Sequence, residues 1–142
     1  MDAYLSILQS LSMFRFRPNY LISAIVLVIV EVLIALYMDD AVIRPYVGDL
    51  LVVILIYCFM RTFLNYSAWQ LAIASLLFSY FVEILQYFKI VEVLGLEKFA
   101  LARILIGTYF TWVDMLAYTA GFIIIILVER FLGHAKPVTD RQ

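Results

Sequence analysis

The sequence has very few of the residues that build reactive or metal-binding sites. It contains one cysteine, Cys58, and one histidine, His134, so no disulfide can form within the chain. Cys58 lies inside an apolar run and His134 in the tail, which argues against a Cys–His catalytic pair and against a zinc site with several such ligands. The few glycines build no glycine-rich phosphate loop. We therefore expect no metal and no cofactor, and we assign no catalytic residue.

Charge is scarce as well. Charged residues make up 15% of the chain, the formal net charge is −1, and no basic stripe is present. A surface that binds nucleic acid needs clustered lysines and arginines. The sequence therefore gives no support for binding to nucleic acid.

Apolar residues, in contrast, dominate the chain. They account for 66% of the sequence, and the mean hydropathy is +1.03. The apolar share of soluble domains is usually nearer half. A protein this small could not cover such a surface with polar groups, so the bilayer must be the solvent for much of it. These features predict an integral protein of the cell membrane.

Four runs approach the roughly 20 apolar residues that a helix needs to cross the hydrocarbon core. They cover residues 20–38, 50–64, 66–88 and 108–132, and none of them contains a proline. The first run is too long for the apolar core of a signal peptide, so we expect it to stay in the membrane. We predict a single all-α domain over residues 1–142, folded as a four-helix transmembrane bundle.

The connections between the runs carry weaker signals. The tight connection "LNYSAW" predicts an antiparallel hairpin of the second and third helices. The segment "KIVEVLGLEKFALARILIG" mixes apolar and charged residues, which predicts an interfacial helical segment between the third and fourth helices. We expect a helix near residues 96–104 that covers the outer mouth of the bundle. Leu5, Leu8 and Leu11 suit a helix on the membrane surface, although a partly ordered tail explains their spacing equally well.

The orientation follows from the basic residues. An even number of spans places both termini on one side of the membrane. Arg15 and Arg17 precede the first span, and six of the ten basic residues fall on the side of the termini. Under the positive-inside rule, this bias predicts that both termini are cytoplasmic.

Four carboxylates lie within or beside the predicted spans: Glu31, Asp49, Glu83 and Asp114. With a rise of about 1.5 Å per residue, all four fall within roughly 10 Å of the outer boundary. Charged groups at this depth are costly unless they are paired or hydrated, and they often mark a functional site. Their common depth predicts a shared polar site in the outer half of the membrane.

Helical spacing places the acids on inward faces. Glu83 shares a face with Gln86, and Asp114 shares a face with Tyr118 and Gly121. A glycine at Gly121 should let a neighbouring helix approach closely. The candidate ligand-binding residues are Glu31, Arg44, Asp49, Glu83, Gln86, Arg103, Asp114 and Tyr118.

Two explanations of this polar group stay open. Arg44 and Arg103 lie on the same side and could simply neutralise two carboxylates and hold the helices together. Four acids and two arginines nevertheless leave an excess of negative charge, so some acids should hold protons or meet a cationic ligand. At the opposite side, we expect Arg61 to reach toward lipid headgroups and Glu129 with Arg130 to anchor the last span at the interface.

Three stretches of the chain resemble a known family. They are "FRFRPNYLISAIVLVIVEVLIALYMDDAVIRPYVGDLLVVILIY", "EILQ" and "GTYFTWVDMLAYTAG". From Phe14 to Arg130, the sequence resembles small bacterial envelope proteins that are VanZ-like and are catalogued only as a domain of unknown function. The resemblance implies a four-helix membrane fold. It also implies signature positions at Glu31, Arg44, Asp49, Glu83, Gln86, Asp114, Tyr118 and Gly121.

The chain departs from the VanZ pattern at two positions. It has Thr108 where those proteins tend to have arginine, and Tyr118 where they tend to have asparagine. We therefore do not transfer the resistance to the antibiotic teicoplanin that is associated with VanZ.

The leading functional hypothesis is a non-enzymatic protein that binds an amphipathic envelope ligand, a lipid or a cell-wall precursor, in the outer polar pocket. One alternative is a small transporter or proton-coupled subunit, which would have to form a homo-oligomer because four spans are few for a carrier. Another is an intramembrane lipid-acting enzyme, with Glu83 or Asp114 as general acid or base. Membrane lipids are the expected partners in each case.

Overall fold

The computed structural model describes residues 1–41, 43–106 and 110–133. Within these ranges every named element is helical, which confirms the all-α prediction. The elements are α1 (Asp2–Ser12), α2 (Pro18–Tyr37), α3 (Ile43–Phe63), α4 (Ala68–Tyr87), α5 (Ile90–Val93), η1 (Leu96–Lys98), α6 (Ala100–Ile106) and α7 (Trp112–Phe131).

Four of the helices, α2, α3, α4 and α7, are long and apolar enough to cross a membrane. Their most apolar windows have mean hydropathies of 2.6, 1.8, 1.6 and 1.8. Each contains 20 or 21 residues, the length that the hydrocarbon core requires. The protein is therefore a four-helix membrane protein, as the sequence predicts.

All four helices begin at other residues than the apolar runs suggest, and the difference is largest for α3 and α7. The helix α3 begins at Ile43 rather than Leu50, and its first turn contains Pro45, where a missing N–H is tolerated. The helix α7 begins at Trp112, after the N-cap residue Thr111. The predicted start at Thr108 lies outside the described residues. An apolar run marks the residues that lipid can surround. The helix α3 extends beyond its run because backbone hydrogen bonds also form where the side chains are polar.

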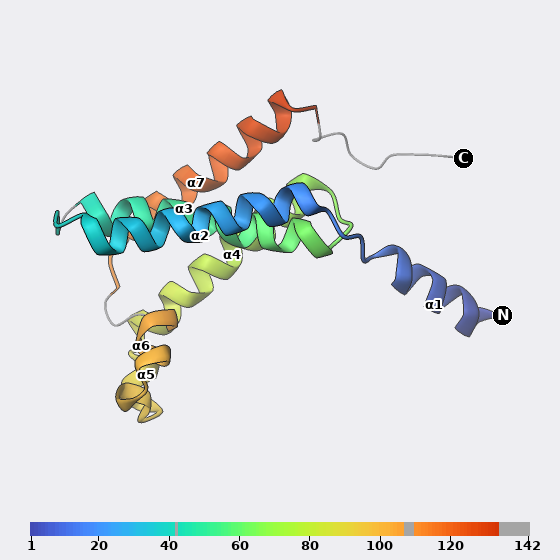
Figure 1. The fold of residues 1–142 in the computed structure, drawn as a ribbon. Helices are drawn as coiled ribbons and strands as arrows, with labels where there is room; N and C mark the ends of the chain where they lie inside the picture. Colours follow the sequence, from blue (N-terminus) through green and yellow to red (C-terminus); the bar gives the residue numbers. More distant parts are fainter. Residues whose placement is uncertain (42, 107–109, 134–142) are drawn as a thin grey trace.

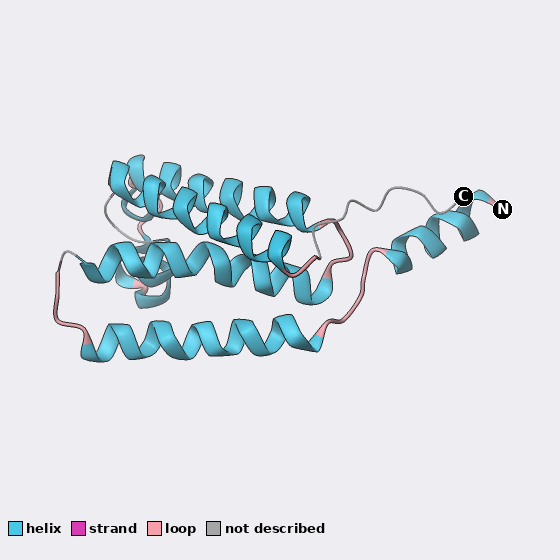
Figure 2. Cartoon of the chain, turned by 90° about the horizontal axis from the view of Figure 1, so that it is seen from above, coloured by secondary structure: helices cyan, strands magenta, loops and turns pink. Residues whose placement is uncertain are grey.

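The helix α3 is the centre of the bundle. It packs against α2, α4 and α7, and α4 packs against α7 as well. The helix α2 lies at one edge, and its backbone packs closely against α3 (Figures 1 and 2). The helices α3 and α4 form the predicted hairpin, and a capping box between Ser67 and Gln70 starts the second of them.

The helices α3 and α7 approach each other closely at Gly121. A Cβ atom built there would lie 2.2 Å from Cγ1 of Val53 and 2.7 Å from the carbonyl oxygen of Leu50. Both distances are far shorter than a van der Waals contact. Only a glycine therefore lets the two helices approach this closely, in the way that small residues act between membrane helices.

The chain before α2 is fixed to the connection between α3 and α4. The backbone N–H groups of Arg15 and Arg17 donate to the carbonyl oxygens of Phe63 and Thr62, both over 2.9 Å. In the other direction, the backbone N–H of Asn65 donates to the carbonyl oxygen of Met13 over 2.7 Å. Before this segment, α1 projects away from the bundle and buries no residue (Figure 1). Its position on a membrane surface stays a prediction.

The segment between α4 and α7 corrects one expectation. Instead of one helix over residues 96–104, it contains α5, η1 and α6, because Lys89 and Gly95 adopt positive φ angles of 52° and 67° and turn the chain. Among the described helices, α5 and α6 pack against α4 and against each other, and η1 packs against α5 and α6; none of the three packs against α3 or α7. They stand beside the end of α4 (Figure 1), so they do not cover the mouth of the bundle as predicted.

Replacement of Gly121 by alanine should destabilise the protein by about 1–3 kcal/mol, because the added methyl group collides with the α3 backbone and with Val53. Thermal unfolding of the purified protein in a mild detergent would measure this loss. The matched control is Gly48→Ala in α3, where an added Cβ meets nothing within 4 Å. That change should be neutral or stabilise by up to about 1 kcal/mol. Equal effects of the two substitutions would contradict the prediction.

Candidate functional site

One buried face of α7 connects the two ends of the bundle. It consists of Asp114, Tyr118, Gly121, Ile125 and Glu129, spaced three or four residues apart. We call the end where α7 begins the α5 end; there α3 begins and α4 ends. We call the opposite end, where α2 and α4 begin and α3 and α7 end, the α1 end. The buried face of α7 therefore brings one carboxylate to each end.

At the α5 end, three carboxylates and a tyrosine from three helices meet. We call Asp49 of α3, Glu83 of α4, and Asp114 and Tyr118 of α7 the acid cluster. The Tyr118 hydroxyl donates to Oε1 of Glu83 over 2.8 Å and lies 3.4 Å from Oδ1 of Asp49. Asp114 lies one turn before Tyr118 on the same buried face of α7. Glu83 is only 1% exposed, and Asp114 is 8% exposed.

The hydrogen bonds of the acid cluster do not account for its charge. A tyrosine hydroxyl carries one proton, and at 2.8 Å this proton belongs to the bond with Glu83. The other oxygen of that carboxyl group, Oε2 of Glu83, is buried and has no partner among the described residues. Ionised carboxylates packed this closely repel one another strongly where water is excluded. The arrangement therefore needs a proton on at least one carboxyl group, or a positively charged group from outside.

The two arginines predicted to join the acids lie elsewhere. Arg44, in the first turn of α3, and Arg103, on α6, are both exposed. Within the described part of the chain, the one ion pair closer than 4.0 Å joins the exposed side chains of Lys89 and Glu92. No arginine of the described residues therefore forms an ion pair with the acid cluster, and the purely structural explanation of the cluster by pairing with Arg44 and Arg103 finds no support.

Two further predicted residues also lie outside the hydrogen-bonded group. Glu31 is half-buried on α2, at the edge of the bundle, and its Oε1 has no partner among the described residues. Gln86 is half-buried one turn after Glu83. The structure thus unites four of the predicted residues, Asp49, Glu83, Asp114 and Tyr118, and separates the other four from them.

At the α1 end, Glu129 corrects the expectation of an interfacial anchor. It is 2% exposed, and its Oε1 accepts hydrogen bonds from the hydroxyls of Tyr20 and Tyr57, both over 2.6 Å. These bonds join α7 to α2 and α3. Glu129 lies on the same helical face as Asp114, so the spacing along the sequence could have predicted that Glu129 is buried.

Arg61 is buried as well, although we expected it to extend toward lipid headgroups. It is 5% exposed, its Nη1 donates to the carbonyl oxygen of Tyr66, and its guanidinium lies 5.6 Å from the centre of the Tyr20 ring. The folded α3–α4 connection supplies the carbonyl group that turns this side chain inward. The apolar run of α3 alone gives no sign of that contact.

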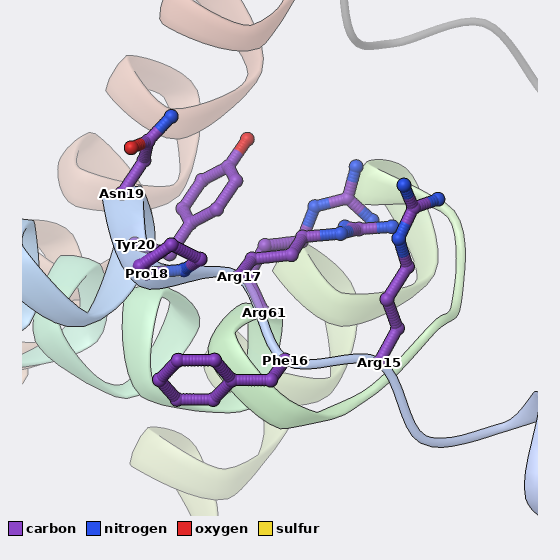
Figure 3. Close-up of a pocket in the computed structure, with 7 residues that line it drawn as sticks. All are labelled: Arg15, Phe16, Arg17, Pro18, Asn19, Tyr20 and Arg61. Atoms are coloured by element: carbon purple, nitrogen blue, oxygen red, sulfur yellow. The ribbon is translucent and has the colours of Figure 1, made fainter.

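Beside Arg61 lies a cavity that the sequence did not predict. It has a volume of about 370 Å³, and Figure 3 shows three guanidinium groups, those of Arg15, Arg17 and Arg61, gathered on one side of it. We call it the arginine cavity. Its lining residues are Arg15, Phe16, Arg17, Pro18, Asn19, Tyr20 and Arg61. The sequence feature that could have predicted this cavity is the pair of arginines before α2. We used these arginines only to predict the orientation of the protein in the membrane.

Metal binding is not favoured by the arrangement of side chains. Among residues 1–41, 43–106 and 110–133, no three histidine, cysteine, aspartate or glutamate side chains are placed to hold a metal ion. The acid cluster is instead suited to a proton or to a single cationic group that donates hydrogen bonds.

The fold and the acid cluster together define a small four-helix membrane protein with uncompensated carboxylates buried at one end. A comparison with family models agrees with this class. Residues 38–122 match the family described as "Protein of unknown function (DUF2809)", and the chain belongs to this family. The matched region contains all four residues of the acid cluster. No curated protein and no solved structure matches the chain.

This match confirms part of the resemblance seen in the sequence. The chain belongs to a family of unknown function, as expected, but the likeness to VanZ proteins is not confirmed. The arginine cavity is formed by Arg61 and by residues that precede the matched region.

The bond between Tyr118 and Glu83 gives a test of the acid cluster. Tyr118→Phe should destabilise the protein by about 1–3 kcal/mol, because it leaves a buried carboxylate oxygen without a donor. Thermal unfolding of Tyr118→Phe, Glu83→Gln and the double variant would give the coupling energy, expected to be about 0.5–3 kcal/mol. Tyr87→Phe, which changes an exposed tyrosine on the same end of α4, is the control and should change little. Strictly additive single effects would rule the interaction out.

Proposed function

We propose that the protein binds an amphipathic envelope ligand, a lipid or a lipid-linked precursor, and that the acid cluster receives a cationic group of this ligand. One observation carries the proposal. Two carboxylates from two helices, Glu83 and Asp49, share the single hydroxyl donor of Tyr118, and Oε2 of the buried Glu83 has no partner among the described residues. A third buried carboxylate, Asp114, lies one turn before Tyr118 on α7. A protonated amine would supply the missing donors and the missing positive charge.

The surroundings of the acid cluster suit an amphipathic ligand rather than a soluble cation. The helices that hold the cluster are apolar along most of their length, so a ligand approaching from the membrane would carry a lipid tail. Asp49 is only half-buried, which makes it the side of the cluster that such a ligand would meet first. That the protein lies in the cell membrane, that both of its termini are cytoplasmic and that it forms a homo-oligomer are still predictions.

The test compares a long-chain amine with an alcohol of the same chain length, for example hexadecylamine and hexadecanol. Binding to the purified protein in neutral detergent would be measured by native mass spectrometry. We expect the amine to bind at least about tenfold more tightly than the alcohol, a difference of roughly 1.4 kcal/mol. The double variant Glu83→Gln/Asp114→Asn should lose this preference.

The control for this test is Glu92→Gln, which removes an exposed carboxylate at the same end. It should leave the preference for the amine within about twofold of the unchanged protein. Equal binding of amine and alcohol, or an unchanged preference in a folded double variant, would refute the proposal.

A second function is favoured by the position of the Tyr118 proton. Because Asp49 lies 3.4 Å from a hydroxyl already bonded to Glu83, the cluster is arranged to take up or release a proton. This arrangement supports the alternative of a proton-coupled transporter subunit. Proton flux into liposomes that contain the protein, lost in Glu83→Gln but kept in Glu92→Gln, would establish this function instead.

A further inference from the structure

We propose that the arginine cavity at the α1 end is a binding site for the phosphate group of an anionic phospholipid, with one acyl chain in an adjoining apolar groove. The site is distinct from the acid cluster, because it uses other residues at the opposite end of the bundle.

The backbone places the three arginines around one space. The segment that contains Arg15 and Arg17 is hydrogen-bonded to the last residues of α3, where Arg61 lies. The side chain of Arg17 is also held from the α3–α4 connection, since its Nη2 donates to Oδ1 of Asn65 over 2.9 Å. The gathering of positive charge is thus a built feature of the fold.

The arginines retain donors that no described residue satisfies. Nη1 of Arg17 and Nε of Arg61 are buried and have no hydrogen-bond partner within the described part of the chain. Burial lowers the pKa of Arg17 below its usual value, and the positive charges of Arg61 and Arg15 lower it further. Unpartnered donors and mutual repulsion are the properties expected of an anion site that is not filled.

Among the described residues, the carboxylate of Glu129 lies at the same end of the bundle, but it does not neutralise the arginines. Oε1 of Glu129 receives the hydroxyls of Tyr20 and Tyr57, and no ion pair within 4.0 Å joins Glu129 to an arginine in the described residues. Three guanidinium groups and one carboxylate leave an excess of positive charge. An anion from outside the protein would balance it.

Phosphate is the anion that fits these groups best. Guanidinium groups bind phosphate oxygens through paired, charge-assisted hydrogen bonds. The first residues of α2, Pro18, Asn19 and Tyr20, also line the cavity. The N–H groups in the first turn of a helix have no acceptor within the helix, and the helix dipole there favours a negative charge.

The surface next to the cavity indicates a phospholipid rather than free phosphate. An apolar groove of about 540 Å³ lies between α2 and α4 and has α3 as its floor. Aromatic rings connect it to the cavity: Phe16 lines the cavity, its ring lies 6.1 Å from that of Phe63, and the Phe63 ring lies 5.3 Å from that of Phe59, which lines the groove. The groove residues are Val28, Leu55, Ile56, Phe59, Met60, Ala74 and Phe78.

The headgroup is tested with dioleoylphosphatidylglycerol, added to the purified full-length protein in neutral detergent, and with native mass spectrometry as the readout. The double variant Arg15→Gln/Arg17→Gln should bind this lipid at least tenfold more weakly than the unchanged protein. Arg130→Gln, which removes an exposed arginine at the same end of the bundle, should stay within twofold. An equal loss in Arg130→Gln would overturn the proposal, because it would show attraction to general surface charge.

Arg61→Gln should weaken binding of the lipid as well, but Arg61 also supports the fold through its contacts with Tyr66 and Tyr20. Arg15 is exposed, so the single variant Arg15→Gln keeps the proposal falsifiable if Arg61→Gln does not fold. An unchanged affinity of folded Arg15→Gln/Arg17→Gln would refute the site.

The groove is tested separately. Ala74→Phe should fill it and weaken binding of dioleoylphosphatidylglycerol at least fivefold, while competition by inorganic phosphate stays unchanged. If Ala74→Phe has no effect and inorganic phosphate displaces the lipid completely at millimolar concentration, the cavity is a site for free phosphate and the lipid proposal fails. Variants of the acid cluster should leave all these results unchanged, so failure here is distinguishable from failure of the proposed amine site.

Discussion

The contact between α3 and α7 at Gly121 sets the position of the polar side chains that the buried face of α7 brings to the two ends of the bundle. Because a Cβ atom at Gly121 would overlap the backbone of α3, the two helices can approach only with a glycine at this point. On one side of the contact, Tyr118 then reaches Glu83 and comes near Asp49. On the other side, Glu129 of the same helical face reaches Tyr57. A single close approach in the middle of the bundle therefore positions both ends.

The two ends of the bundle carry opposite charges, and the distance between them prevents the acid cluster and the arginine cavity from neutralising one another. If the arginines had met the carboxylates, the result would have been a set of buried ion pairs, for which a structural role is sufficient. Instead Arg44 and Arg103 are exposed, the acid cluster lacks a cation, and the buried arginine, Arg61, lies at the other end. Each end is then left with charge that only a proton or a bound group can balance.

The sequence predicts the fold well and the sites in part. Hydrophobic length predicts four membrane helices, and helical spacing predicts that Asp114, Tyr118 and Gly121 share a buried face, because both depend on local geometry alone. The partner of a long side chain depends on contacts between distant segments. The arginine cavity exists because the residues before α2 bond to the end of α3, a pairing that no local pattern encodes. For the same reason, common depth alone could not predict that Glu31, Arg44 and Arg103 lie outside the hydrogen-bonded acid cluster.

The carboxylates at the two ends of the bundle differ in their hydrogen bonding. At the α1 end the hydrogen bonds serve the structure, whereas the excess of carboxylates at the α5 end needs a further explanation. Between membrane helices the hydrophobic effect gives little attraction, so polar contacts and close packing must hold the bundle together. Glu129 shows what such a contact requires: one carboxylate that accepts from two tyrosines and joins three helices. At the α5 end the ratio is reversed, with three carboxylates for one tyrosine. Stability alone would be better served by fewer acids, since each added charge increases the repulsion. The additional carboxylates, like the unpartnered arginine donors at the other end, are therefore best explained by what they bind.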